Sequence, residues 1–168
     1  MSPAADTSPD TIYIYTDGAC SGNPGRGGYG TILKAGNLTK ELSGGFIKTT
    51  NNRMELMAVI KGFEALKHEG NKVVVVSDSK YVTEAIKQGW LFNWEEKGWK
   101  KVKNPDLWKR LLQLYRKHDV KVEWVKGHAS HPENERCDEL AVSAIRSHEL
   151  EEDTGFNAAI DLGNFNFM

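Results

Sequence analysis

Four consecutive valines, Val73 to Val76, lead into Ser77 and Asp78 and restrict the possible folds more than any other feature of this sequence. A strand with one face in water alternates apolar and polar side chains. This run does not alternate, so we expect both of its faces to be buried, as in the parallel centre of an α/β sheet. The chain should therefore form an α/β domain with helices on both faces of a sheet.

The rest of the chain divides into segments with strand-like or helix-like patterns. We expect strands at 11–17, 28–34, 40–46, 72–77 and 120–125, and helices at 51–69, 79–88, 105–118 and 133–148. Either Asn51 or Asn52 is expected to cap the first helix. The first three strands indicate an antiparallel meander, and the last two should add parallel strands. This order predicts a mixed five-stranded sheet with helices on both faces.

Length and composition indicate one folded domain. The 168 residues suit a single core, which we place at 11–150. Residues 1–10 are polar and rich in Pro and Ser, so we expect a disordered leader. Residues 151–168 form a tail that carries several apolar side chains. We hypothesise that this tail docks on the domain and adds stability, with a disordered tail as the alternative.

Several classes of protein are excluded or disfavoured. No apolar run approaches the roughly 20 residues that cross a bilayer, so a membrane protein is not expected. The only cysteines, Cys20 and Cys137, lack the spacing of a disulfide framework, which favours a reducing cytoplasm. No long amphipathic heptad pattern indicates a dimer, and a monomer is expected.

Charge is distributed unevenly along the chain. The net charge is −1, yet residues 97–126 contain ten basic residues and only three acids. These are Lys97, Lys100, Lys101, Lys103, Lys109, Arg110, Arg116, Lys117, Lys121 and Lys126, against Asp106, Asp119 and Glu123. Such a basic region is typical of a protein with a polyanionic partner.

Four acidic residues, Asp17, Glu55, Asp78 and Asp138, stand where folding could bring them together. Asp17 and Asp78 each close a run expected to form a buried strand. Open α/β sheets have their ligand crevices at the carboxyl ends of such strands. The pattern suggests metal chemistry, although any one of these acids alone would be explained as a solvated side chain or a helix cap.

A glycine pattern at Gly25–Gly30 satisfies G-x-G-x-x-G and follows a strand, as in dinucleotide-binding proteins. In those proteins the pattern opens a helix that holds the pyrophosphate. Here it runs into the β-rich Thr31-Ile32-Leu33, so we interpret it as a tight connection between antiparallel strands. An oxidoreductase is therefore disfavoured.

Five short motifs occur in a characteristic order. They are Tyr15-Thr16-Asp17-Gly18-Ala19-Cys20-Ser21-Gly22-Asn23-Pro24-Gly25, Thr49-Thr50-Asn51-Asn52-Arg53-Met54-Glu55-Leu56, Ser77-Asp78-Ser79, Val125-Lys126-Gly127-His128-Ala129 and Asn134-Glu135-Arg136-Cys137-Asp138-Glu139. Together they closely resemble the bacterial type 1 ribonuclease H family over about residues 11 to 155. The joint match is specific, whereas each motif alone is weak.

The resemblance implies an endonuclease that hydrolyses the RNA strand of RNA–DNA hybrids and leaves 5′-phosphate and 3′-hydroxyl ends. It implies that Asp17, Glu55, Asp78 and Asp138 bind metal, and two ions about 4 Å apart would activate water and stabilise the leaving oxygen. Hard oxygen ligands favour Mg²⁺, with Mn²⁺ as a substitute. Converging carboxylates repel one another, so at least one should hold its proton more tightly when metal is absent.

Two histidines require separate interpretations. The resemblance implies that His128 shuttles protons or assists product release, which suits an imidazole that titrates near neutrality. His128-x-x-His131 with Cys137 could suggest zinc, but one histidine pair and a distant cysteine make a poor structural site. We exclude that zinc site.

The resemblance also implies contacts to both strands of a hybrid. It implies 2′-hydroxyl contacts by Cys20, Asn23, Asn51 and Asn52, and a DNA-phosphate contact by Thr50. Trp90 would lie under the DNA sugars, and the basic protrusion would contain Trp94, Trp99, Lys97, Lys100, Lys101 and Lys103. A tryptophan cluster that packs one helix onto another is the structural alternative for the three aromatic residues.

Three features depart from the best-known bacterial pattern. Glu95-Glu96 replaces basic residues, and the segment between Gly98 and Asp106 is shorter. Lys80 replaces the commoner glutamine, which could turn one polar contact into a phosphate contact. The first two departures affect the expected hybrid affinity rather than the chemistry, and Lys80 could shift the sequence preference. The competing functions are a catalytically silent hybrid-binding module and a related nuclease that cuts DNA.

Overall fold

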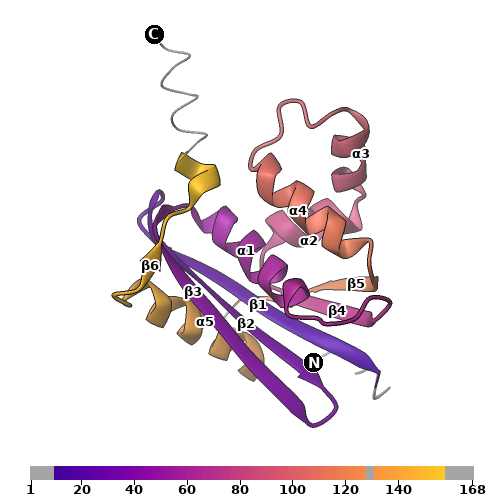
Figure 1. Ribbon diagram of the computed structural model, residues 1–168, viewed down its shortest axis with the longest axis horizontal. Helices are drawn as coiled ribbons and strands as arrows, with labels where there is room; N and C mark the ends of the chain where they lie inside the picture. Colours follow the sequence, from indigo (N-terminus) through magenta and orange to yellow (C-terminus); the bar gives the residue numbers. More distant parts are fainter. Residues whose placement is uncertain (1–9, 128–130, 158–168) are drawn as a thin grey trace.

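The computed structural model describes residues 10–127 and 131–157 (Figure 1). Over these ranges the strands are β1 (Thr11–Ser21), β2 (Gly25–Ala35), β3 (Leu38–Thr49), β4 (Lys72–Ser77), β5 (Asp119–Trp124) and β6 (Leu150–Glu151). The helices are α1 (Asn51–Glu64), α2 (Lys80–Lys87), α3 (Trp90–Glu96), α4 (Pro105–Tyr115) and α5 (Pro132–Ile145).

All the described strands belong to one mixed sheet in the order β5-β4-β1-β2-β3-β6. The predicted meander β1-β2-β3 is antiparallel, and β4 and β5 join it in parallel. The prediction of five strands was wrong, because β6 adds a sixth by pairing Leu150 and Glu151 with Gly45 and Phe46. Two residues are too few to produce a periodic pattern in a sequence.

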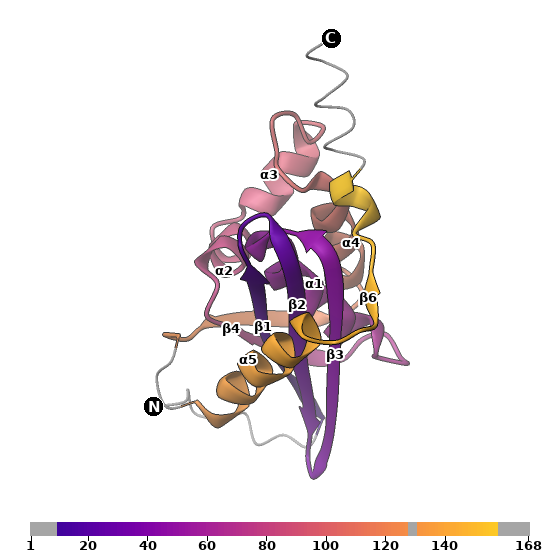
Figure 2. The same ribbon diagram turned by 90° about the vertical axis from the view of Figure 1, so that its left-hand side faces the viewer.

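Helices cover both faces of the sheet, as predicted. α1 packs on β1 and β2 and also contacts α4, whereas α5 packs against β1, β2 and β3 (Figure 2). In the central strand β4, Val73 and Val75 are 1% and 0% exposed, while Val74 and Val76 are 7% and 6% exposed. The expectation that this strand is buried on both faces is confirmed.

The glycine pattern lies inside β2 rather than in the connection before it, which corrects our interpretation of a tight turn. A Cβ atom at Gly28 would lie 2.4 Å from the carbonyl oxygen of Ala141, and one at Gly30 would lie 2.1 Å from that of Cys137. These distances are shorter than any van der Waals contact. The glycines therefore let α5 approach the sheet directly, and no helix with a pyrophosphate site follows them.

Several boundaries differ from the predicted ones. β1 continues past Asp17 to Ser21, because Gly18–Ser21 pair with the first residues of β2. The tryptophan-rich segment forms a helix of its own, α3, which the sequence analysis did not predict. The helices α1 and α4 end several residues early, where Ala65 and Arg116 close them.

The helix cap of α1 also differs from the prediction. Thr50 is the N-cap residue, and its hydroxyl accepts a hydrogen bond of 3.3 Å from the backbone N–H of Arg53. Asn51 and Asn52 are the first helical residues, so neither of them caps the helix.

Some predictions fall on parts of the chain outside the described residues. The expected disordered leader falls there except for Asp10, and so does most of the tail. The docking hypothesis for 158–168 therefore stays a prediction. Among the described residues, no helix is both long and apolar enough to cross a membrane.

Candidate metal centre and nucleic-acid interface

Three carboxylates converge at one end of the sheet. The parallel ladder between β1 and β4 ends at the pair Thr16 and Ser77, so the residues that follow, Asp17 and Asp78, lie side by side. Glu55 reaches them from α1, and one oxygen from each of the three carboxylates lies within 4.8 Å of the others. The structure thus assembles an acidic cluster from β1, α1 and the residue after β4.

A glycine allows α1 to come close enough for Glu55 to join this cluster. A Cβ atom at Gly18 would lie 2.5 Å from the backbone nitrogen of Glu55, too close for any side chain. The helix therefore rests on the backbone of β1 next to Asp17. In the first motif, Asp17 thus provides one carboxylate, and Gly18 leaves the space that Glu55 needs to bring a second carboxylate beside it.

Burial and mutual repulsion raise the pKa values of this cluster. Burial, and then the charges of Asp78 and Asp138, raise the pKa of Asp17 from 3.8 to about 8, although the Gly18 N–H opposes the shift by donating to Asp17 Oδ1 at 3.0 Å. Burial, and then the charges of Asp17 and Asp78, also raise the pKa of Glu55. These directions agree with the expectation that the cluster retains protons in the absence of metal.

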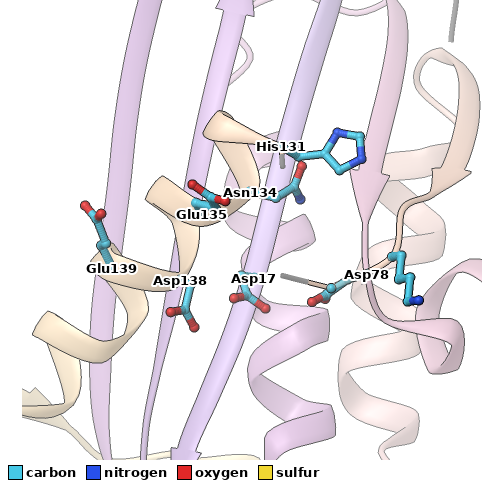
Figure 3. Close-up of a pocket in the computed structure, with 9 residues that line it drawn as sticks. Asp17, Asp78, His131, Asn134, Glu135, Asp138 and Glu139 are labelled. Atoms are coloured by element: carbon cyan, nitrogen blue, oxygen red, sulfur yellow. The ribbon is translucent and has the colours of Figure 1, made fainter. Parts of the chain in front are cut away.

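Asp138 comes from α5 and lies at the edge of this cluster. It lines a cavity of about 180 Å³ together with Asp17 and Asp78. Figure 3 shows the side chain of Asp17 between those of Asp138 and Asp78. Asp138 is not part of the tight group formed by the other three acids. The structure therefore brings all four predicted acids to one place, with Glu55 buried next to Asp17 and Asp78 and with Asp138 lining the cavity.

Other residues, which the sequence motifs did not identify as functional, also line the cavity. Its lining includes Lys126, Gly127, His131, Asn134, Glu135 and Glu139. Asn134 donates from Nδ2 to the carbonyl oxygens of Thr16 and Val76, both at 3.5 Å. It precedes Asp138 by four residues, so helical spacing places both on one face of α5. That spacing was the sequence signal that could have identified Asn134.

The excluded zinc site is also inconsistent with the geometry of Cys137. This cysteine is a fully buried residue of α5, and its Sγ donates to the carbonyl oxygen of Tyr15 at 3.2 Å. His131 instead lines the acidic cavity. His128 lies outside the described residues, so its expected role in proton transfer stays a prediction.

The residues expected to contact the 2′-hydroxyls lie near the start of α1. Asn23 Oδ1 accepts from the backbone N–H of Asn51 at 3.1 Å, which joins the β1–β2 turn to the helix. Cys20 lies nearby, with its Sγ 3.5 Å from the carbonyl oxygen of Thr49. Asn51 and Asn52 are exposed, and these contacts place Cys20 and Asn23 beside the start of α1, next to the capping residue Thr50.

The tryptophans of the expected protrusion have different environments. Trp90 is 47% exposed, whereas Trp94 packs edge-on against the buried Trp108 with ring centroids 5.3 Å apart. Lys109 lies over the ring of Trp99 at 5.9 Å. Trp94 and Trp99 therefore pack α3 and the following loop onto α4, as the structural alternative expected, and Trp90 retains an exposed surface.

Glu95 is paired with Arg116, one of the ten basic residues of the 97–126 region. Glu95 forms a two-point ion pair with Arg116, with one nitrogen–oxygen distance of 2.7 Å. Arg116 also holds the pKa of Glu95 below its usual value. The carboxylate is thus matched by a cation of α4 rather than directed at the lysines of 97–103.

The comparison with protein families identifies the chain. The family model for RNase H matches residues 9–146. The chain belongs to the ribonuclease H family. Ribonuclease H of Desulforamulus reducens is 54% identical over 155 residues, covering 89% of this chain and 97% of the relative. Ribonuclease H of Escherichia coli is 53% identical over 154 residues, with the same coverage of both chains.

Solved structures of the ribonuclease H family agree with this assignment. LC9-RNase H1, described as a type 1 RNase H with the type 2 active-site motif, is 32% identical. It superimposes with a TM-score of 0.73 and covers 89% of this chain and 81% of its own. LC11-RNase H1, solved in complex with an RNA/DNA hybrid, is 27% identical, with a TM-score of 0.59 and coverage of 80% and 96%. The predicted membership of the bacterial type 1 family is confirmed, and the chain is a ribonuclease H hydrolase.

Proposed function

We propose that this protein is an endonuclease that cleaves the RNA strand of RNA–DNA hybrids, leaving 5′-phosphate and 3′-hydroxyl ends, with Mg²⁺ as its cofactor. The observation that carries the proposal is the convergence of Asp17, Glu55 and Asp78 within 4.8 Å in a chain of this family. The hybrid bound to LC11-RNase H1 supports the choice of substrate.

The chemistry of the acidic cluster fits a divalent cation. Glu55 is 5% exposed, and its Oε2 has no hydrogen-bond partner among the described residues. A buried carboxylate oxygen without a partner is costly unless a cation or a proton satisfies it. Asp17, Glu55, Asp78 and Asp138 would hold the metal, and their hard oxygen donors favour Mg²⁺ with Mn²⁺ as a substitute. When bound, two such ions supply activation of water and stabilisation of charge on the leaving oxygen.

The protein's own residues orient these carboxylates. The Gly18 N–H fixes one oxygen of Asp17, and the end of the β1–β4 ladder sets Asp17 beside Asp78. Ion binding would replace the proton that burial and the neighbouring charges favour on Asp17, so metal binding would release a proton. In this proposal His128 moves a proton to or from the cleaved strand, or assists release of the product.

The hybrid would lie across the acidic cavity and along two polar surfaces. Cys20, Asn23, Asn51 and Asn52 would contact 2′-hydroxyls and bases in the minor groove, because amides both donate and accept hydrogen bonds. Thr50 would contact a DNA phosphate at the start of α1.

The basic protrusion and Trp90 would bind the DNA strand. Trp90, with its exposed ring, would lie under the sugars, and Lys100 and Lys101 would approach phosphates. Trp94 and Trp99 would act mainly by packing this protrusion onto α4. Lys80, at the start of α2, would contact a phosphate near the cleavage site.

Cleavage of a labelled RNA–DNA hybrid in Mg²⁺ tests the proposal. Duplex DNA and duplex RNA serve as competing substrates, and end analysis of the products identifies the 5′-phosphate. Asp17→Asn is expected to lower cleavage by at least about 100-fold, since it removes a charge from the cluster. Asp119→Asn is the matched control, because Asp119 starts β5 at the opposite end of the sheet.

The outcomes separate the competing functions. Cleavage of the hybrid alone, abolished by Asp17→Asn and retained by Asp119→Asn, would support the proposal. Tight hybrid binding without cleavage would identify a silent binding module, and cleavage of duplex DNA would identify a different nuclease of the superfamily. We further propose that the enzyme acts as a monomer in the cytoplasm, which light scattering and cell fractionation would test.

A further inference from the structure

Asp78 occupies a short connection between two elements. It follows β4, whose last residue, Ser77, pairs with Trp124 of β5, and α2 begins two residues later at Lys80. The backbone of Asp78 therefore lies beyond the β4 ladder. Its orientation depends on neighbours outside that strand.

Trp124 supplies one of these neighbours. Its indole Nε1–H donates to the backbone carbonyl oxygen of Asp78 at 3.0 Å. The following segment also approaches Asp78, because a Cβ atom at Gly127 would lie 2.9 Å from Asp78 Oδ2. Trp124 thus contacts the backbone carbonyl of Asp78, and Gly127 lies against its carboxylate.

The ring face of Trp124 contacts a cation. The ammonium of Lys80 lies 4.8 Å from the centroid of the Trp124 ring. Trp124 is 39% exposed, so its ring contributes to the surface rather than to the core. A large exposed aromatic side chain contributes little to stability by burial, and contact with both Asp78 and Lys80 gives it a different use.

We propose that Trp124 is a positioning residue for the reaction proposed above, on which this inference rests. Its indole N–H fixes the peptide of Asp78 and so aims that carboxylate into the acidic cluster. Its ring holds the ammonium of Lys80 beside the same site, and there the ammonium contacts a phosphate of the substrate. One side chain thereby couples orientation of an acidic residue to a contact with the nucleic-acid backbone.

Two substitutions separate these contributions. Trp124→Phe keeps an aromatic face but lacks the N–H donor, so kcat should fall at least about tenfold with KM unchanged. Trp124→Gln offers an amide N–H of similar reach but no ring, so kcat should stay near the wild-type value while KM rises about threefold. Calorimetric titration with Mg²⁺ alone should show weaker binding to Trp124→Phe than to wild type or Trp124→Gln.

Trp108→Phe provides the matched control. This substitution also removes an indole hydrogen bond, because the Nε1–H of the buried Trp108 donates to the hydroxyl of Tyr81 at 3.0 Å. Neither residue belongs to the acidic cluster. It should lower the melting temperature while leaving kcat and Mg²⁺ binding unchanged. If Trp108→Phe loses as much kcat as Trp124→Phe for a similar fall in melting temperature, the loss reflects destabilisation and the positioning role is overturned.

The remaining outcomes are also decisive. If Trp124→Phe raises KM without lowering kcat, or leaves both unchanged, the inference is wrong. If the wild-type protein does not cleave the hybrid, the proposed function fails by itself. The Mg²⁺ titration then still tests the positioning of Asp78, because equal affinities in Trp124→Phe and wild type would overturn it.

Discussion

Asp153→Asn should destabilise the protein strongly, because Asp153 is the buried partner of a buried arginine. Arg53 and Asp153 are 2% and 4% exposed. The Nε and Nη2 groups of Arg53 donate to the two oxygens of Asp153 at 2.7 and 2.8 Å, and the Thr49 hydroxyl donates to Oδ2 at 2.6 Å. An asparagine of the same shape removes the charge and replaces one acceptor with a donor.

The expected magnitude follows from what remains around Arg53. Removing one partner of a buried ion pair costs roughly 3–5 kcal/mol. Arg53 also forms a two-point pair with Asp106 at 2.9 and 2.7 Å, so part of its charge stays compensated. We therefore expect the lower limit, about 3 kcal/mol, which corresponds to a fall in melting temperature of roughly 6–12 °C for a chain of this size.

Urea unfolding at pH 7, followed by far-ultraviolet circular dichroism, measures this loss directly. Asp106→Asn is the matched control, because the same arginine loses a carboxylate whose side chain is 44% exposed. Water compensates an exposed partner, so the control should cost only about 1 kcal/mol. Equal losses in the two variants, or a loss below about 1 kcal/mol in Asp153→Asn, would refute the reasoning.

Two further predictions concern the acidic cluster and the contact between sheet and helix. The pKa of Asp17 is raised from 3.8 to about 8 on folding, so its stabilising contribution is complete below pH 4 and is lost as the pH rises toward 8. Urea unfolding in EDTA tests this. Asp17→Asn should be more stable than wild type by at least about 1 kcal/mol at pH 8 and similar to it at pH 4. A difference in stability that does not change with pH would contradict the prediction. Gly30→Ala should cost about 3 kcal/mol or more in the same assay, because its Cβ would collide with the carbonyl of Cys137. Gly36→Ala is the control, because a Cβ atom there would meet no neighbour and only the φ of +57° is unfavourable. It should lower the free energy of unfolding by only about 1 kcal/mol. Equal losses of stability in the two variants would argue against the collision at Gly30.

Much of the fold was predictable because its signals are local. The run Val73–Val76 indicated burial on both faces, and the structure confirms it. The order of strands and helices followed from periodicity, and the motifs identified the family. The misses were also local in origin: β6 is too short to have a pattern, and the helix α3 is formed by a segment whose tryptophans suggested a cluster rather than a helix.

The acidic site was predictable only in its list of residues. The expected strand ends indicated that Asp17 and Asp78 should be neighbours. They are neighbours because the parallel ladder between β1 and β4 ends just before them, although β1 itself continues to Ser21. The approach of Glu55 depends on Gly18, and the position of Asn134 depends on the docking of α5. Such contacts join elements far apart in the chain, and no local pattern encodes their distances.

The central buried strand, the mixed α/β class and the family could be predicted from local sequence, because apolar periodicity and short motifs are properties of neighbouring residues. The partners of the buried charges could be identified only in the folded chain. Arg53 was part of a motif, yet its buried partner, Asp153, lies 100 residues away. The same holds for the indole of Trp124 and the carbonyl of Asp78, which are separated by 46 residues. A buried charge or an oriented peptide requires a partner within hydrogen-bond distance, and only packing of the complete chain supplies it.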